Sequence, residues 1–214
     1  MAGQVDWQPF FLNTDTPEEG EDLKEHITKK YGAEMARRFS GPDNPLAVAG
    51  QKVGISFNPA RRVIPTGRCH VVMEHVNQTR GIEKGNDLMK VLFKMYAHSG
   101  TFPASRIIIA LIALIRLRNG RMLGSRYFEE GLDVSRIPQL LVACTTVFGE
   151  ASRAEFAALL QDDTKLAEQV REKDRAAKSR LRVSGVPFFI IGTATFSGAQ
   201  PPEMLAEVLQ EALD

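Results

Sequence analysis

The sequence has few cysteines, no recognisable metal motif and no long apolar run. Its two cysteines, Cys69 and Cys144, lie far apart and form neither a CxxC pair nor a metal-ligand spacing. Both stand among apolar residues at helical spacing, so we expect two buried structural thiols; an incidental reactive thiol or an opportunistic disulfide are the alternatives. The four histidines form neither HExxH nor a pair at metal spacing, so no metal site is predicted.

Strong charge and a leader segment are also lacking. The net charge of +1 argues against a dedicated nucleic-acid-binding protein, and no GxGxxG or GxxxxGK[ST] phosphate loop is present. The first residues show no basic segment followed by an apolar core, so no secretory signal is visible. Together with the separated cysteines, this favours a reducing compartment, and the expected location is the cytoplasm.

What is present is an ordinary globular composition, with 43% hydrophobic and 25% charged residues. Residues 5–12 indicate an aromatic-rich strand, and the Thr16–Glu19 capping box predicts a helix that ends before Gly32. Apolar spacing and capping signals then predict helices at 45–53, 66–79, 86–96, 135–148, from 152, and 165–182. Two short strands at 188–191 and 194–197 and a helix at 201–213 follow.

The C-terminal stretch SGVPFFIIG, residues 184–192, is an apolar strand that opens with Val186 and Pro187. Proline has no N–H and belongs at the first residue or the edge of a strand, and it makes a cis peptide bond accessible. A cis bond here leaves neighbouring backbone groups free to meet an extended chain or a thiol ligand. A plain strand-start proline is the alternative.

This pattern resembles the DsbA-like branch of the thioredoxin superfamily, in particular its FrnE-type members and their hydroxychromene-carboxylate isomerase and kappa-class glutathione transferase relatives. The resemblance is carried, in order, by VDWQPFFLN (5–13), PEEGED (17–22), KYG (30–32), LFKMY (92–96), YFEEGLD (127–133), and the runs 184–192 and 196–202. It implies an α/β fold: a thioredoxin-like sheet with an all-helical insertion domain. Residues 1–15 and 163–214 would form the thioredoxin-like part, which would be incomplete, and residues 16–162 the insertion.

Two departures limit what the resemblance implies. Family members begin with a strand and then a CxxC motif, or a serine, at a helix start that lowers the thiol pKa. This chain starts at what resembles the second strand, so we expect the first strand and the CxxC helix to be missing and the edge of residues 188–191 to be open. A homodimer is one way to cover such an edge, although nothing in the sequence requires it.

The second departure is the atypical segment 97–126, which interrupts a run that is continuous in the family. Its longest apolar stretch, residues 107–115, is too short for a membrane span, which takes about 20 residues. From Leu88 to Phe128 the chain has basic but no acidic residues. Three interpretations stay open: an interfacial amphipathic segment, an extra buried helix, or a non-native insertion such as translated intron sequence.

By resemblance, a complete protein of this type is a thiol-disulfide oxidoreductase acting on protein or small-molecule thiols and disulfides. Gly185, Val186 and Pro187 are then the expected substrate-binding residues, with no cofactor and with glutathione as a candidate ligand. Because the CxxC segment is absent, we expect no redox turnover from this chain, and no catalytic residue is named. The alternatives are a glutathione-dependent isomerase or transferase-like protein and a non-catalytic binding module.

Overall fold

The structure is a computed structural model that describes residues 5–40, 44, 48, 62–99, 133, 135–162, 164–198 and 200–212. The elements, in chain order, are β1 (Glu21–Asp22), α1 (Leu23–Tyr31), α2 (Ala33–Ser40), β2 (Arg62–Val63), α4 (Gly67–Arg80), α5 (Ile82–Ser99), α8 (Ile137–Phe148), the 3-10 helix η1 (Glu150–Ser152), α9 (Arg153–Gln161), α10 (Thr164–Ser179), β3 (Phe188–Ile191), β4 (Ala194–Ser197) and α11 (Pro202–Glu211).

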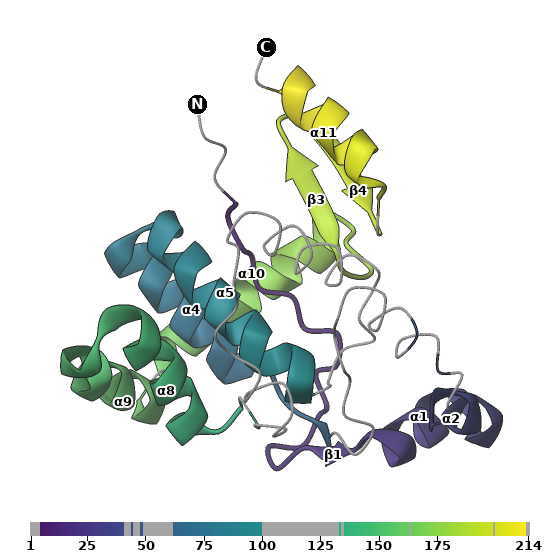
Figure 1. The fold of residues 1–214 in the computed structure, drawn as a ribbon, viewed down its shortest axis with the longest axis horizontal. Helices are drawn as coiled ribbons and strands as arrows, with labels where there is room; N and C mark the ends of the chain where they lie inside the picture. The colour runs from purple at the N-terminus through teal and green to yellow at the C-terminus, as the bar shows by residue number, and fades with distance from the viewer. Residues whose placement is uncertain are drawn as a thin grey trace.

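These elements are arranged in three parts (Figure 1). Helices α4, α5, α8, α9 and α10 form a central bundle, which we call the helical body. At one end stands the C-terminal unit, the antiparallel β3–β4 hairpin with α11 beside it, in which Phe188 pairs with Ser197 and Ile191 with Ala194. At another end lie α1 and α2, and the two-residue strands β1 and β2 pair antiparallel beside them.

The core lies inside the helical body. Its fully buried side chains include Val72 and Val76 of α4, Leu88 of α5, Leu140 of α8 and Phe156 of α9. These positions follow the helical periodicity of the sequence, so that each helix turns one apolar stripe toward the others.

Polar contacts also fasten α10 to α4. The carboxylate of Glu74 is buried and accepts two hydrogen bonds from Lys173 Nζ, at 2.7 and 2.8 Å. Gln78 Nε2 donates to the same carboxylate at 2.7 Å. A buried carboxylate needs such partners, because an unpaired charge inside a protein is costly.

A glycine follows each of two core helices. Gly81 follows α4 with φ +84° and Gly149 follows α8 with φ +82°. Residues with a Cβ rarely adopt this left-handed region, so glycine is favoured at both positions. The strands at 188–191 and 194–197 also begin and end where the sequence predicts.

The prediction that residues 5–12 form a strand is wrong. They run as an extended segment without a ladder partner among the described residues, and we call them the N-terminal segment. The physical reason lies at Phe11, whose backbone N–H and C=O are both bonded to side chains of α10 rather than to another strand.

The expected helix start at Thr16–Glu19 is also wrong. The helix begins at Leu23, and its N-cap is Asp22, whose carboxylate accepts from Glu25 N–H at 3.0 Å. Upstream, Gly20 N–H donates to Pro17 C=O at 2.8 Å and closes a turn in place of a helical one. An aspartate is as good an N-cap as a threonine, and here the cap is Asp22 rather than Thr16.

Other expected positions lie outside the described residues. These are most of the helix expected at 45–53 and residues 100–126 of the atypical segment; residues 97–99 complete α5. Among the helices that the structure describes, none is long and apolar enough to cross a membrane.

Candidate functional site

The loop before β3 has the geometry that the sequence suggests. The Val186–Pro187 peptide bond is cis, which confirms that expectation. Gly198 N–H, just after β4, donates to Pro187 C=O at 2.9 Å and so extends the hairpin bonding onto the loop. Gly185, Val186 and Pro187 are all partly exposed.

The loop is held from its other side by the turn that ends α10. Val183 N–H donates to Ala177 C=O at 3.0 Å, and the Val183 side chain is buried. Arg182, between this anchor and the last turn of α10, has φ +54°. The three-residue loop is therefore fixed at both ends, by Val183 and by Gly198.

The main chain of Val186 is the open part of the loop. Neither its N–H nor its C=O has a hydrogen-bond partner among the described residues. Backbone donors and acceptors are normally paired in a folded protein, so a ligand that approaches as an extended chain would find both groups available.

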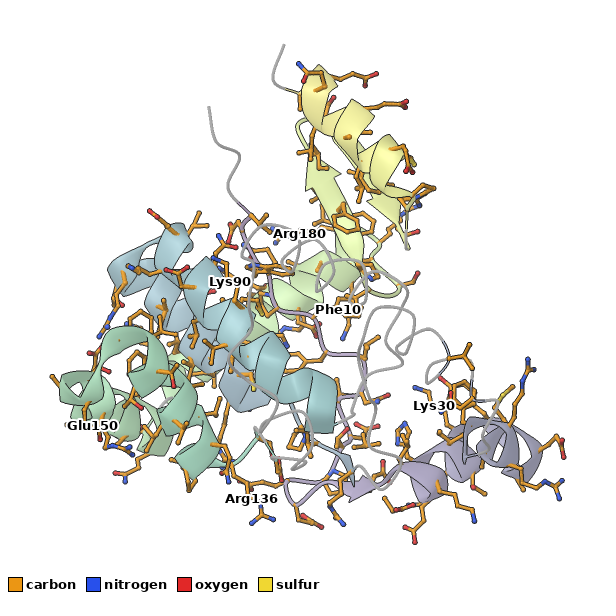
Figure 2. The ribbon with its side chains drawn as sticks, viewed as in Figure 1. Phe10, Lys30, Lys90, Arg136, Glu150 and Arg180 are labelled. Atoms are coloured by element: carbon orange, nitrogen blue, oxygen red, sulfur yellow. The ribbon has the colours of Figure 1, made fainter. Side chains whose placement is uncertain are left out.

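Beside this loop, α10 binds the N-terminal segment through its backbone. Asp174 Oδ1 accepts from Phe11 N–H at 2.8 Å, and Lys178 Nζ donates to Phe11 C=O at 2.9 Å. The two side chains are themselves paired at 2.8 Å, and Asp174 is buried. The Lys178 ammonium also lies 4.9 Å from the ring centroid of Phe10, which Figure 2 labels.

A second anchor holds the other end of the N-terminal segment on α5. The Trp7 indole N–H donates to Asn86 Oδ1 at 2.7 Å, and Asn86 Nδ2 donates to Val5 C=O at 2.8 Å. Trp7 also packs against the core of the helical body. These side-chain contacts replace the strand pairing that the sequence predicts for residues 5–12.

His70 lies beneath the same segment. Its ring makes an edge contact with Phe11, with centroids 5.1 Å apart and planes at 82°. Burial lowers the pKa of His70 to about 4, although the Asp174 charge and a hydrogen bond to the Phe10 backbone act in the opposite direction. The imidazole is therefore neutral at physiological pH and acts as a packing group.

Neither cysteine is placed for thiol chemistry. Cys69 on α4 and Cys144 on α8 are buried and neither forms a disulfide, as the sequence predicts. Burial is the largest of the causes that raise the pKa of each thiol to about 12, and Asp133 acts in the same direction on Cys69, as Cys69 does on Cys144. The thiolate is the nucleophile in disulfide exchange, so these two groups are inert at neutral pH.

Other chemistry is weak in the part of the chain that the structure describes. No group of three or more His, Cys, Asp or Glu side chains there could hold a metal ion. A cavity of about 280 Å³ lies between the N-terminal segment, the start of α4 and α10, and its lining includes Phe11, Arg68 and Arg171 but no residue of the 185–187 loop.

The observed combination defines the class of fold. A β-hairpin led by a cis-proline loop and followed by a helix, joined through α10 to a large helical region, is a thioredoxin-like α/β arrangement with a helical insertion. The chain matches the model of the DSBA-like thioredoxin domain over residues 3–210. The protein belongs to the DSBA-like thioredoxin domain family.

A solved structure supports the same fold. The crystal structure of a probable DsbA oxidoreductase from Streptomyces coelicolor superposes with a TM-score of 0.65 at 21% sequence identity, over 95% of this chain and 73% of that one. The comparison with curated proteins found no match.

The structure brings Gly185, Val186 and Pro187 together as one loop, while their role in binding stays a prediction. Sequence reasoning missed the neighbouring Asp174, Lys178 and His70. Asp174 and Lys178 are four residues apart on the helix predicted over 165–182, and this spacing, which pairs side chains on one helical face, is the signal that could have found them. The division into domains at residues 15 and 162 also stays a prediction.

Proposed function

We propose that this chain binds extended polypeptides, or small peptide-like thiols such as glutathione, at the Gly185–Pro187 loop without redox turnover. One observation carries the proposal: both thiols of the 214-residue chain are buried with pKa values near 12, whereas the Val186 main chain is open. The chain thus keeps the part of the family's site that holds a substrate and has no reactive thiol of its own. The FrnE-type subclass and a cytoplasmic location belong to the same proposal.

The chemistry of the loop supports a ligand that is itself backbone-like. One N–H and one C=O on the same residue match the C=O and N–H of a single residue in an antiparallel strand. These hydrogen bonds are made to the main chain of the ligand and not to its side chains. Proteins and small peptides can therefore both bind in this way. Thiol-disulfide exchange needs, in addition, a thiolate that attacks a disulfide sulfur.

Amide NMR spectra of the full chain test the binding half of the proposal. On titration with a short uncharged β-forming peptide, and separately with oxidised glutathione, we expect saturable shifts of the Gly185 and Val186 amides. Amides of α11 serve as the internal control. Shifts confined to other regions, or no saturable shift with either ligand, would contradict the proposed site.

An insulin-reduction assay tests the other half. With dithiothreitol as reductant, we expect the rate with this chain to equal the rate without protein. Cys69→Ser and Cys144→Ser are the matched variants: a rate above background that either substitution abolishes would show that a buried thiol does turn over.

A further inference from the structure

The stretch of sequence that contains the 185–187 loop carries charge of one sign. After Asp174, the sequence contains no acidic residue until Glu203 of α11. Over the same interval it has four basic residues, Arg175, Lys178, Arg180 and Arg182. A one-signed stretch around a binding loop creates a local potential that favours ligands of the opposite charge.

Two of these basic groups are neutralised locally. Lys178 is paired with Asp174 at 2.8 Å, and Arg175 is paired with Glu168 at 2.6 Å and with Glu172 at 2.7 Å. Their charges therefore add little to the field that an incoming ligand meets.

Arg180 and Arg182 are the two that remain. Both are exposed, and within the described residues neither forms an ion pair. Figure 2 shows Arg180 in the segment that connects α10 to β3, ahead of the loop. The turn that carries both arginines is fixed by the bonds from Arg180 N–H to Ala176 C=O at 2.9 Å and from Val183 N–H to Ala177 C=O at 3.0 Å.

The spacing along the chain keeps these charges near the loop. Arg182 and Gly185 are three positions apart, so their Cα atoms are at most about 11 Å apart, and those of Arg180 and Gly185, five positions apart, at most about 18 Å. An arginine side chain adds several ångströms of reach, and the screening length at physiological ionic strength is about 8 Å. A ligand held at Val186 therefore meets the guanidinium groups where its flanking side chains extend toward α10 and cover the remaining distance.

We propose that the Gly185–Pro187 loop selects acidic peptides, with Arg180 and Arg182 as the specificity-determining residues that pair with carboxylates flanking the bound stretch. This inference rests on the proposed function and names its ligand class. The loop supplies contacts that any extended chain makes, and the two guanidinium groups discriminate by charge. Exposed ion pairs are individually weak, so the expected preference for an acidic over a neutral peptide is roughly three- to tenfold.

The test measures binding of three peptides to the full chain by fluorescence anisotropy. The peptides share a Val-Ser-Val centre, blocked termini and an uncharged methoxycoumarin label, and differ only in two flanking residues, which are Glu, Gln or Lys. We expect affinity in the order Glu, Gln, Lys, with the differences shrinking as sodium chloride is raised, because exposed charges are screened.

Variants assign the effect to the two arginines. Arg180→Gln with Arg182→Gln should make the three affinities equal, and Arg180→Glu with Arg182→Glu should reverse their order. The matched control is Lys24→Glu with Arg38→Glu, an equal charge change at exposed positions on α1 and α2, away from the loop. This control should preserve the order of the unmodified chain.

The outcomes separate the two proposals. Equal binding of all three peptides to the unmodified chain, or a control that shifts the order as much as the Arg180 and Arg182 variants do, would overturn charge selection and leave the binding loop standing. No binding of any of the three peptides would overturn the proposed function and this inference with it.

Discussion

Two aromatic pairs show how differently the helical body and the C-terminal unit are held. Phe148 and Phe156 stack in the helical body with centroids 5.5 Å apart, and Phe189 and Phe196 stack across the hairpin at 5.2 Å. The Phe156 side chain is fully buried, whereas both hairpin rings are partly exposed. Phe148 is also partly exposed, so the difference lies in Phe156, which is the one ring of the four that water does not reach.

The contrast extends to the whole of each region. The helical body has a continuous core, but between residues 184 and 212 no described side chain is buried. Ile190 of β3 and Leu209 of α11 are 56% and 46% exposed. An isolated two-stranded hairpin is at best marginally stable in water, so the C-terminal unit depends on α11 and on its attachment through Val183. The 185–187 loop thus belongs to the less stable of the two regions.

The largest expected effect compares the two stacked pairs directly. Phe156→Ala should lower the free energy of unfolding by about 3–5 kcal/mol, because it opens a cavity in a closed core. Phe196→Ala, in a pair of the same geometry, should cost about 1 kcal/mol, because water already reaches the ring. Urea denaturation followed by far-UV circular dichroism measures both. Equal losses would mean that the hairpin is as well packed as the helical body.

A smaller effect is expected where the N-terminal segment meets α10. Asp174→Ala removes the acceptor of the Phe11 N–H and the partner of Lys178, and should cost about 1–3 kcal/mol. Trp7 is the only tryptophan of the chain, so its fluorescence emission should shift to longer wavelength if the segment detaches.

Glu172→Ala is the matched control for this substitution. Glu172 lies on the same helix, is exposed and pairs with Arg175, so we expect a loss of less than about 0.5 kcal/mol and no change in emission. An unchanged emission in both variants would show that the Asn86 contact alone holds the segment.

His70 should make the stability of the helical body depend on pH. Its pKa falls from the ordinary 6.5 to about 4 on folding, so below pH 6.5 the unfolded chain binds a proton that the folded chain does not. Stability should therefore fall as the pH is lowered from about 6.5 to about 4, and the loss is complete below the folded value.

His70→Gln is the variant that isolates this contribution. Urea midpoints measured between pH 7.5 and pH 4 should fall less steeply for the variant than for the unmodified chain. Parallel curves would assign the acid sensitivity to other groups, such as the Glu155 carboxylate, whose pKa is lowered by hydrogen bonding to His75.

The smallest effect is expected on the outward surface of β3. Ile190→Thr exchanges one β-branched side chain for another at an exposed strand position, and should change stability by no more than about 0.5 kcal/mol. Thermal unfolding at several protein concentrations checks this value. A loss above about 1.5 kcal/mol, or one that depends on concentration, would show that another chain covers Ile190 in solution.

The sequence predicts the elements whose signals are local. The two C-terminal strands follow from an apolar run bounded by Pro187 and Gly192, and the end of α8 follows from Gly149. Proline fixes its own backbone and glycine adopts a positive φ at little cost, so no distant contact is needed to interpret these residues.

The errors concern residues whose state depends on partners elsewhere. The N-terminal segment has a strand-like composition, but a strand also needs a neighbouring strand, and Asp174 and Lys178 take the backbone bonds instead. The helix predicted over 165–182 ends early, because α10 ends at Ser179, and Leu181 beyond it is 52% exposed. Ser152 precedes α9 as expected, but its hydroxyl donates to Gly149 C=O rather than capping the helix.

The candidate site also has one part that the sequence predicts and one that it does not. The 185–187 loop can be predicted from a proline at a strand start, because the proline itself fixes the local backbone conformation. The hydrogen bond between Asp174 and Phe11 joins residues 163 positions apart, and a local sequence pattern does not predict a contact over such a separation.

The hydrogen bonds of Asp174 and Lys178 to the backbone of Phe11 have a consequence for sequence variation. The two side chains hold an amide hydrogen and a carbonyl oxygen, groups that every amino acid except proline supplies in the same form. These hydrogen bonds therefore allow any of the nineteen residue types other than proline at position 11. They require an acidic side chain at position 174 and a basic one at position 178. Among related chains that keep these hydrogen bonds, we therefore expect an acidic residue at position 174 and a basic residue at position 178 to be conserved, and position 11 to vary.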